Sequence, residues 1–102
     1  MDLVFRALAD DSRRALLDSL CGHSGQTLAE LCSGLAMSRQ AVSKHIAILE
    51  DANLVATVKR GREKLHYLNA VPIAEIANRW IRKFERHRVD ALVGLKRKLE
   101  SE

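Results

Sequence analysis

The sequence predicts a mainly α-helical fold with one small β-hairpin, and two observations carry this prediction. Apolar residues recur at helical spacing in five segments, the last of which runs from about 72 to about 100. Two short runs of strand-forming residues, 55–58 and 65–68, flank a polar connection that contains a glycine. The order of these elements predicts a winged helix-turn-helix that is dimeric through its terminal helices.

Size and composition favour a single domain over residues 1–102. Of the 102 residues, 47% are hydrophobic and 29% are charged, which suits one compact unit. No run of 18 apolar residues is present, and the first residues lack the pattern of a signal peptide. The 2 cysteines do not imply a disulfide framework. We therefore expect a cytoplasmic protein with no membrane partner.

The first two segments predict a short helix followed by a longer one. Residues 2–9 carry the apolar set of the short helix. Asp10, Asp11 and Ser12 follow, and this acidic, cap-forming cluster suits the positive end of the next helix dipole. The second helix ends near Gly22 and places Leu16, Leu17, Leu20 and Cys21 together. These helices are expected to support the pair that follows.

Residues 27–51 predict two helices joined by a tight turn. Thr27 and Glu30 have the spacing of a capping box, in which each side chain satisfies an otherwise unpaired backbone donor. The first helix should bury the stripe Leu28, Leu31, Cys32 and Leu35. Ser38 should cap the second helix, whose apolar side carries Val42, Ile46 and Leu49. Asn53 is a suitable left-handed stop after it.

The polar side of the second helix has a composition suited to reading DNA bases. It carries Arg39, Gln40, Ser43, Lys44 and Ala47. Arginine can bind guanine O6 and N7 with two hydrogen bonds, glutamine can do the same with adenine N6 and N7, and alanine can contact a thymine methyl group. Net charge supports this reading, because residues 1–37 carry −2 whereas residues 38–69 and 70–102 each carry +3.

Residues 55–68 predict a wing, because the connection between the two strands is basic. It reads Lys59-Arg60-Gly61-Arg62-Glu63-Lys64. One interpretation is a hairpin kept soluble by charge. We prefer a wing whose Arg60, Arg62 and Lys64 reach phosphates or the minor groove, given the neighbouring helix pair. His66 is expected to be a half-exposed strand residue.

The last segment, from Pro72 to about 100, predicts a helix that is too long for the core of one small domain. About 29 residues at 1.5 Å each span about 44 Å. Its apolar stripe should meet the same stripe of a second copy in a two-fold dimer. The predicted interface comprises Trp80, Phe84, Leu92, Leu95 and Leu99, together with Phe5 and Leu8 of the first helix.

Two segments resemble the ArsR/SmtB family of bacterial winged-helix repressors. Residues 7–14, ALADDSRR, are similar to the family's opening LADxTRR segment, and residues 38–49, SRQAVSKHIAIL, are similar to its SRPAVSxHLxxL recognition helix. The resemblance implies a nucleoid-associated transcriptional repressor that binds an imperfect palindromic operator as a homodimer. Carried onto matching positions, it implies DNA contacts by Ser38, Arg39, Gln40, Ser43, Lys44 and His45, with the wing adding Arg60, Arg62 and Lys64.

The sequence departs from the metal sensors of this family. The arsenic and cadmium sensors carry a Cys-x-Cys pair where this chain has Thr27 and Ala29. The zinc sensors use acids and histidines along the last helix, where this chain offers Glu85, His87 and Asp90 with a single histidine. We therefore expect no metal site, no cofactor and no metal effector.

Alternatives remain open at this stage. Cys21 and His23 form a Cys-x-His pair that Cys32 could join, so a metal-responsive repressor, or one switched by a Cys21–Cys32 disulfide, is one alternative. A winged-helix module that binds only other proteins is another. An enzyme is not expected, because the chain lacks a recognisable nucleophile, phosphate loop or paired carboxylates. The sequence identifies no small-molecule effector.

Overall fold

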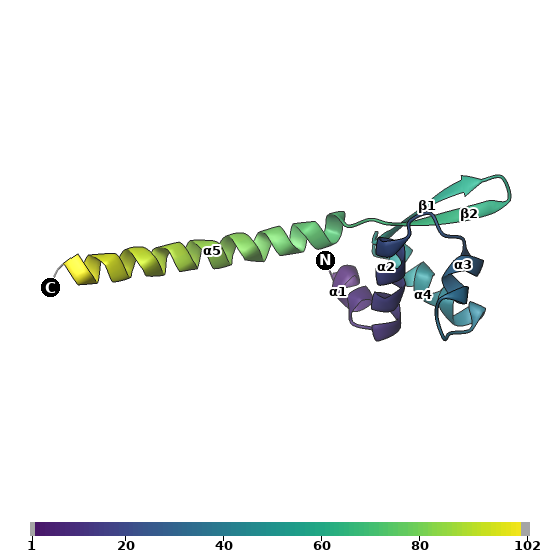
Figure 1. The fold of residues 1–102 in the computed structure, drawn as a ribbon, viewed down its shortest axis with the longest axis horizontal. Coiled ribbons are helices and arrows are strands. Elements are labelled where there is room, and N and C mark those ends of the chain that lie inside the picture. The colour runs from purple at the N-terminus through teal and green to yellow at the C-terminus, as the bar shows by residue number, and fades with distance from the viewer. Residues whose placement is uncertain (1, 101–102) are drawn as a thin grey trace. The chain divides into compact units, whose positions relative to one another are not determined.

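The structure, a computed structural model, describes residues 2–100 and confirms a mainly helical chain with one hairpin (Figure 1). The chain divides into two compact units, residues 1–72 and 73–102, which are described separately, and the single domain stays a prediction. The element order is α1 (Asp2–Leu8), α2 (Asp11–Gly22), α3 (Leu28–Ser33), α4 (Arg39–Asp51), β1 (Val55–Arg60), β2 (Glu63–Leu68) and α5 (Val71–Glu100).

Arginine side chains join α1 to α2. Arg13 donates from Nε to the Ala7 carbonyl at 2.8 Å and from Nη2 to the Arg6 carbonyl at 3.0 Å. Arg14 donates from Nη1 to the Leu8 carbonyl at 2.6 Å. These carbonyls lie in the last turn of α1, where they have no partner within the helix. Asp10 caps α2 in turn, because its carboxylate accepts from the Arg13 backbone N–H at 3.1 Å.

The predicted caps of α3 and α4 are confirmed. Thr27 Oγ1 accepts from the Glu30 backbone N–H at 3.2 Å, and Glu30 Oε1 accepts from the Thr27 backbone N–H at 3.3 Å, which completes the capping box. Ser38 Oγ accepts from the Ala41 backbone N–H at 3.1 Å. Both helices therefore begin where the sequence indicates.

The C-terminus of α4 is closed by a Schellman motif. Asn53 has a φ of 61° in the left-handed region. Its N–H donates to the Glu50 carbonyl at 2.9 Å, and the Leu54 N–H donates to the Leu49 carbonyl at 2.9 Å. Leu49 and Leu54 are both fully buried, as the hydrophobic contact of this motif requires. The predicted left-handed stop at Asn53 is therefore confirmed.

The core of residues 1–72 is built around α4, which packs against α1, α2, α3 and β1. Its largest fully buried side chains are Leu16, Leu20, Leu31, Val42, Leu49 and Leu54. In the α2 group, Leu16, Leu17 and Leu20 are buried, whereas Cys21 is exposed in the last turn. The prediction of a buried α3 stripe was wrong in part. Only Leu31 is buried, while the other three residues are half-buried, and Leu35 lies outside the helix because α3 ends at Ser33.

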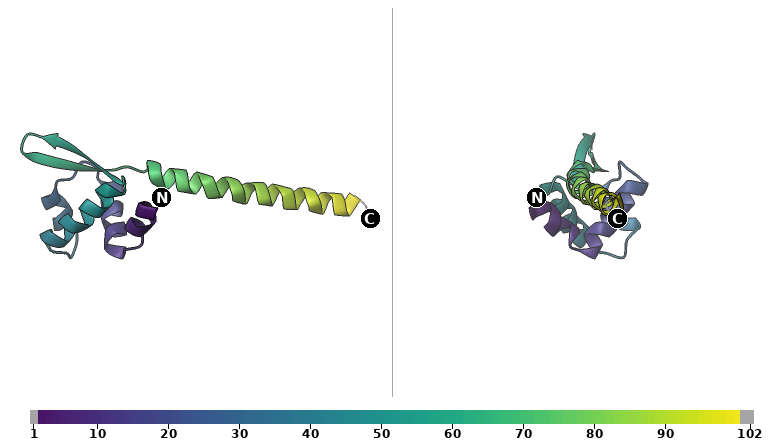
Figure 2. Two further views of the ribbon diagram at one scale, coloured as in Figure 1. Left: turned by 180° about the vertical axis from the view of Figure 1, so that it is seen from behind. Right: turned by 90° about the vertical axis from the view of Figure 1, so that its left-hand side faces the viewer.

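The hairpin pairs β1 and β2 in antiparallel register, from Val55 with Leu68 to Arg60 with Glu63. Each strand is two residues longer than predicted, because two residues, Gly61 and Arg62, are enough to reverse the chain. Gly61 has a φ of 61°, which glycine adopts without steric cost. Within residues 1–72 the tip of the hairpin extends outward past the helices (Figure 2).

The helix α5 forms the second unit. None of its described residues is buried, and it carries large apolar side chains along its length. Across the described chain, no helix combines the length and the apolar content needed to cross a membrane.

Candidate nucleic-acid interface

One side of α4 presents polar side chains to solvent. Val42, Ile46 and Leu49 face the core, and the helical period therefore turns the other side outward. Every residue that the sequence placed on that outer side is exposed, namely Arg39, Gln40, Ser43, Lys44 and Ala47, and so is the capping residue Ser38. The side has hydrogen-bonding groups of four kinds, hydroxyl, guanidinium, amide and ammonium, and no carboxylate among these residues. It can therefore bind a surface that offers both donors and acceptors.

A groove of about 530 Å³ runs between α4 and the hairpin. At the start of α3 it is lined by Thr27, Leu28 and Ala29. From α4 the groove is lined by Arg39, Ser43, Ile46, Ala47 and Glu50, and from the hairpin by Arg62, Glu63, Lys64 and His66. The structure thus brings part of the predicted helix contacts and part of the predicted wing contacts to one concave surface.

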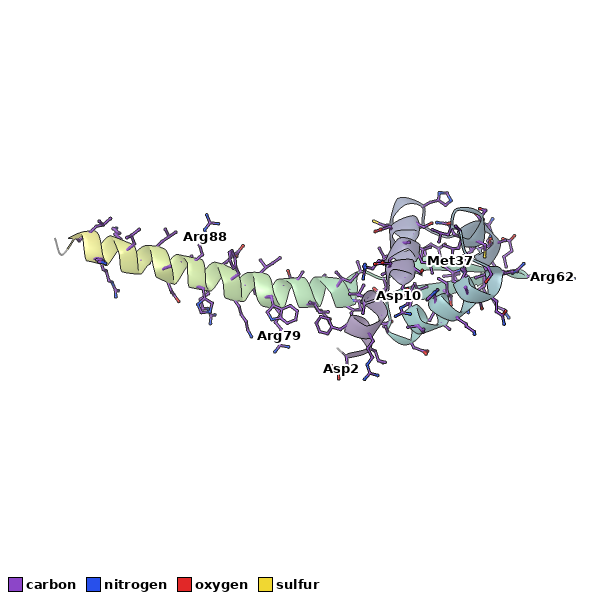
Figure 3. The ribbon with its side chains drawn as sticks, turned by 90° about the horizontal axis from the view of Figure 1, so that it is seen from below. Asp2, Asp10, Met37, Arg62, Arg79 and Arg88 are labelled. Atoms are coloured by element: carbon purple, nitrogen blue, oxygen red, sulfur yellow. The ribbon has the colours of Figure 1, made fainter. Side chains whose placement is uncertain are left out.

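The groove is not uniformly basic. Glu50 Oε1 lies 3.4 Å from Lys64 Nζ, so the lysine predicted to contact DNA is paired with a carboxylate of the same chain. The Lys64 side chain is 53% exposed and that of Glu50 is 30% exposed. Arg60 and Arg62 are exposed nearer the turn, and Arg62 lies at the tip of the hairpin (Figure 3). The tip is therefore the more available cationic part of the wing.

His66 lines the groove but is itself buried, and the prediction that it would be half-exposed was wrong. The residue is 3% exposed, because the loop between α2 and α3 adds a β-bridge to β2 at this point. His66 Nδ1 lies 2.8 Å from the Gln26 carbonyl oxygen, which can only accept, so Nδ1 carries a hydrogen. His66 Nε2 lies 4.0 Å from Glu50 Oε1.

Gln26 fixes this loop, and its role was not found from the sequence. Its Nε2 donates to the carbonyls of His23, at 2.6 Å, and Ser19, at 3.0 Å. Its backbone exchanges hydrogen bonds with His66, whose N–H donates to the Gln26 carbonyl at 2.8 Å. The only signal in the sequence was a glutamine directly before the capping box, and its burial is seen only in the structure. Glutamine is mostly exposed in proteins, so the residue type alone does not identify such a contact.

His45 lies on a different side of α4 from the other predicted contacts. Its side chain is 22% exposed, and its Nδ1 lies 3.9 Å from Asp10 Oδ2 and 3.4 Å from Arg13 Nη1. The hydrogen bond from the Arg13 backbone, with the Arg13 and His45 side chains nearby, lowers the pKa of Asp10 below its usual value. His45 therefore joins α4 to the junction of α1 and α2.

The two cysteines and the histidine of the alternative metal site lie at two different helices. Cys21 and His23 are exposed at the end of α2, whereas Cys32 is half-buried in α3. Within residues 2–100, no three or more histidine, cysteine or acidic side chains gather closely enough to hold a metal ion. Thr27 and Ala29, which stand where the metal sensors carry their Cys-x-Cys pair, line the groove at the start of α3.

The predicted interface residues of α5 are exposed. Phe84 is 67% exposed and Leu99 is 62% exposed, and Trp80, Leu92 and Leu95 are also exposed. In α1, Phe5 is exposed and Leu8 is half-buried. Arg79 and Arg88 project to opposite sides of α5 (Figure 3). By its spacing of four residues from both Phe84 and Leu92, Arg88 lies on the apolar side, which the sequence analysis did not note.

Comparison with known proteins gives one domain match and close relatives. A family described as a helix-turn-helix domain matches residues 8–58. The chain is 36% identical over 86 residues to YuzN of Bacillus subtilis, an uncharacterized HTH-type transcriptional regulator, covering 78% of this chain and 94% of YuzN. It is 29% identical over 84 residues to the transcriptional repressor SdpR of the same organism, covering 82% of this chain and 91% of SdpR.

Among solved structures, the chain is similar to an ArsR-like transcriptional regulator from Rhodococcus sp. RHA1. The TM-score is 0.76 and the identity 32%, over 99% of this chain and 91% of that protein. The similarity thus extends over all the elements described above.

Proposed function

Because the chain belongs to the ArsR family of DNA-binding transcriptional regulators, we propose that it is a repressor that binds an imperfect palindromic operator as a homodimer and needs no metal effector. The observation that carries the proposal is the outer side of α4, where Arg39, Gln40, Ser43 and Lys44 are all exposed on a helix capped at Ser38. The likeness to the repressor SdpR supports the direction of regulation.

In this proposal α4 is the recognition helix and lies in the major groove. Arg39 and Gln40 stand in its first turn, where a recognition helix contacts base edges. Each can make two hydrogen bonds to one base, and Ala47 can contact a thymine methyl group. Ser38, Ser43 and Lys44 supply further contacts to bases or phosphates. Arg60 and Arg62 at the wing tip bind the adjacent backbone or minor groove.

The homodimer is proposed from α5. Its apolar side chains are exposed over a helix of 30 residues, which at 1.5 Å per residue is about 45 Å long. Burial of such a stripe stabilises an assembly by about 25 cal/mol per Å² of apolar surface. Two copies of Trp80, Phe84, Leu92, Leu95 and Leu99, with Phe5 and Leu8 of α1, form the proposed interface. A two-fold dimer presents two copies of α4 to the two halves of a palindrome.

Independence from metals is proposed from the residues at the family's sensor positions. Thr27 and Ala29 have no thiolate, and Thr27 Oγ1 is already engaged in the capping box. Added zinc or arsenite should therefore leave operator affinity within about twofold, far from the 1–3 kcal/mol of coupling that is typical of an effector.

The nucleoid is the proposed place of action.

Fluorescence anisotropy tests the proposal with a labelled fragment of the DNA immediately upstream of the protein's own gene. The wild type should bind this fragment more tightly than the same fragment in scrambled order. Arg39→Ala or Gln40→Ala should each lose discrimination of roughly 1–3 kcal/mol while the circular dichroism spectrum is unchanged. Arg6→Ala, which removes an exposed cation from α1, is the matched control and should keep the discrimination. Equal binding of both fragments by the wild type would contradict the proposal.

A further inference from the structure

Glu50 is the one carboxylate of α4 that contacts the wing in the described structure. Its Oε1 lies 3.4 Å from Lys64 Nζ and 4.0 Å from His66 Nε2, both on β2. His66 is itself held by the loop before α3, through the Gln26 carbonyl. One carboxylate oxygen of the proposed recognition helix is thus close to two side chains at the base of the wing.

We propose that Glu50 determines DNA specificity by keeping Lys64 from binding phosphates. The wing then contacts DNA through the arginines of its tip and not through Lys64. This inference rests on the proposed function, because it concerns how the same surface discriminates an operator from other DNA.

The argument starts from what a phosphate contact contributes. A lysine that neutralises a phosphate releases counterions and strengthens binding to every DNA sequence, but it carries no sequence information. A lysine that is already neutralised by a carboxylate of its own chain makes no such contribution. Glu50 therefore lowers the part of the affinity that does not depend on sequence.

An exposed ion pair alone would be too weak to hold Lys64 against a polyanion. The position of Glu50 supplies the additional effect, since its side chain is only 30% exposed and lies in the groove that faces the DNA. If Lys64 moved to a phosphate, it would leave an unpaired carboxylate close to the DNA backbone. Repulsion between that carboxylate and the phosphates opposes the exchange.

Glu63 provides a matched control for the general effect of charge. It also lines the groove, on the neighbouring residue to Lys64, and it is exposed. It takes part in none of the ion pairs found among residues 2–100. Glu63→Gln and Glu50→Gln remove the same charge from the same groove, but only Glu50→Gln releases Lys64.

The test measures the salt dependence of binding to a duplex of about 30 base pairs of random sequence. The logarithm of the observed affinity falls linearly with the logarithm of the salt concentration, with a slope of about −0.9 for each phosphate contacted. Glu50→Gln should make the slope steeper by about 0.9, whereas Glu63→Gln should not. Lys64→Gln should keep the wild-type slope, because no phosphate contact is lost, although the unpaired Glu50 carboxylate should lower the affinity itself. The double variant Glu50→Gln with Lys64→Gln should return to the wild-type slope without that loss of affinity.

Two results would overturn the inference. A slope that becomes shallower by about 0.9 in Lys64→Gln alone would show that Lys64 contacts a phosphate with Glu50 in place. Equal slopes for Glu50→Gln and Glu63→Gln would show that the change comes from the loss of any negative charge in the groove and not from the release of Lys64. Lys64→Gln changes an exposed side chain, so its result decides the matter even if Glu50→Gln impairs folding.

The upstream fragment separates this inference from the proposed function. Glu50→Gln should lower the ratio of affinities for the upstream fragment and the random duplex. If the wild type shows no such preference, the proposed function fails, while the slopes on the random duplex still report on Lys64. If the preference is present and the slopes do not change, only the inference about Glu50 fails.

Discussion

Asp10 shows how one side chain can join three helices. It caps α2 through the Arg13 backbone N–H and lies 3.9 Å from His45 Nδ1 on α4. Arg13 in turn donates to carbonyls at the end of α1. The cap and the neighbouring positive charges stabilise the ionised carboxylate, which is why the pKa of Asp10 is lowered.

The lowered pKa of Asp10 predicts a pH dependence of stability. A carboxylate whose pKa is lower in the folded chain than in the unfolded chain stabilises the fold above its unfolded value, about 3.9, and this contribution is lost as pH falls through the folded value. Asp10→Asn should therefore have a lower melting temperature than the wild type at neutral pH, and the difference should shrink below about pH 4. Thermal unfolding followed by circular dichroism measures this.

Asp18→Asn is the control for that measurement, because it removes a carboxylate from the exposed side of the same helix. Asparagine at position 10 can still cap a helix, so the comparison isolates the charge from the hydrogen bond. A difference between wild type and Asp10→Asn that stays constant from pH 7 to about pH 3 would contradict the prediction.

At the scale of single elements, the starts of the helices agree with the sequence better than the element lengths do. Capping depends on a few neighbouring residues, and the caps of α3 and α4 are accordingly those that the sequence indicates. The lengths of α3 and of the wing strands differ from those that the sequence predicts. α3 has only 6 residues, and the strands of the wing extend to a two-residue turn at Gly61 and Arg62. Pairing across the hairpin and packing on α4 decide these lengths, and neither is a local property.

The Schellman motif after α4 gives a prediction about Asn53. With a φ of 61°, this residue is in a conformation that costs most L-residues about 1 kcal/mol or more. Asn53→Ala should lower the free energy of unfolding by about 1 kcal/mol, whereas Asn53→Gly should change it by only a few tenths. Chemical denaturation measures both. Equal destabilisation by the two variants would show that the asparagine side chain, rather than the backbone conformation, is needed.

At the scale of the whole molecule, most of the exposed large apolar side chains in the described chain lie on α5. The sequence predicts its stripe, and the structure leaves the stripe exposed. An apolar side of this size on one helix is typical of an interface. The dimer stays a prediction, because the apolar stripe of α5 can be buried only against a second chain.

Leu92→Gln combined with Leu95→Gln tests the dimer in the full-length chain. Each leucine buried in an interface contributes about 1.5 kcal/mol or more, and a two-fold dimer loses four of them. The dissociation constant of the dimer should therefore rise at least about 10,000-fold. Glutamine favours helices, so α5 should persist. Binding to a two-half-site operator should fall steeply, while binding to a single half-site should change little. Analytical ultracentrifugation measures the assembly.

Arg86→Gln combined with Arg97→Gln makes the matched change on the opposite side of α5. This control should leave the dissociation constant within a few-fold of the wild type, because charged side chains there remain in water. A wild type that is monomeric at micromolar concentration, yet binds the operator tightly, would contradict a dimer through α5.

The sequence by itself determined the order of the elements, the caps at Thr27 and Ser38, the left-handed stop at Asn53 and the exposed side of α4. These features depend on local backbone hydrogen bonds and on the period of apolar residues, both of which are written in neighbouring positions. The family resemblance rested on the same local segments and was confirmed by the comparisons.

Only the tertiary structure decided the placement of the polar side chains between elements. His66 is buried because the distant Gln26 pairs with it, His45 faces Asp10 rather than the outer side of α4, and Lys64 is paired with Glu50. Partners 14 to 40 residues apart in the chain meet because the core brings their elements together. A histidine or lysine is compatible with either a buried or an exposed site, so its residue type alone does not fix its partner.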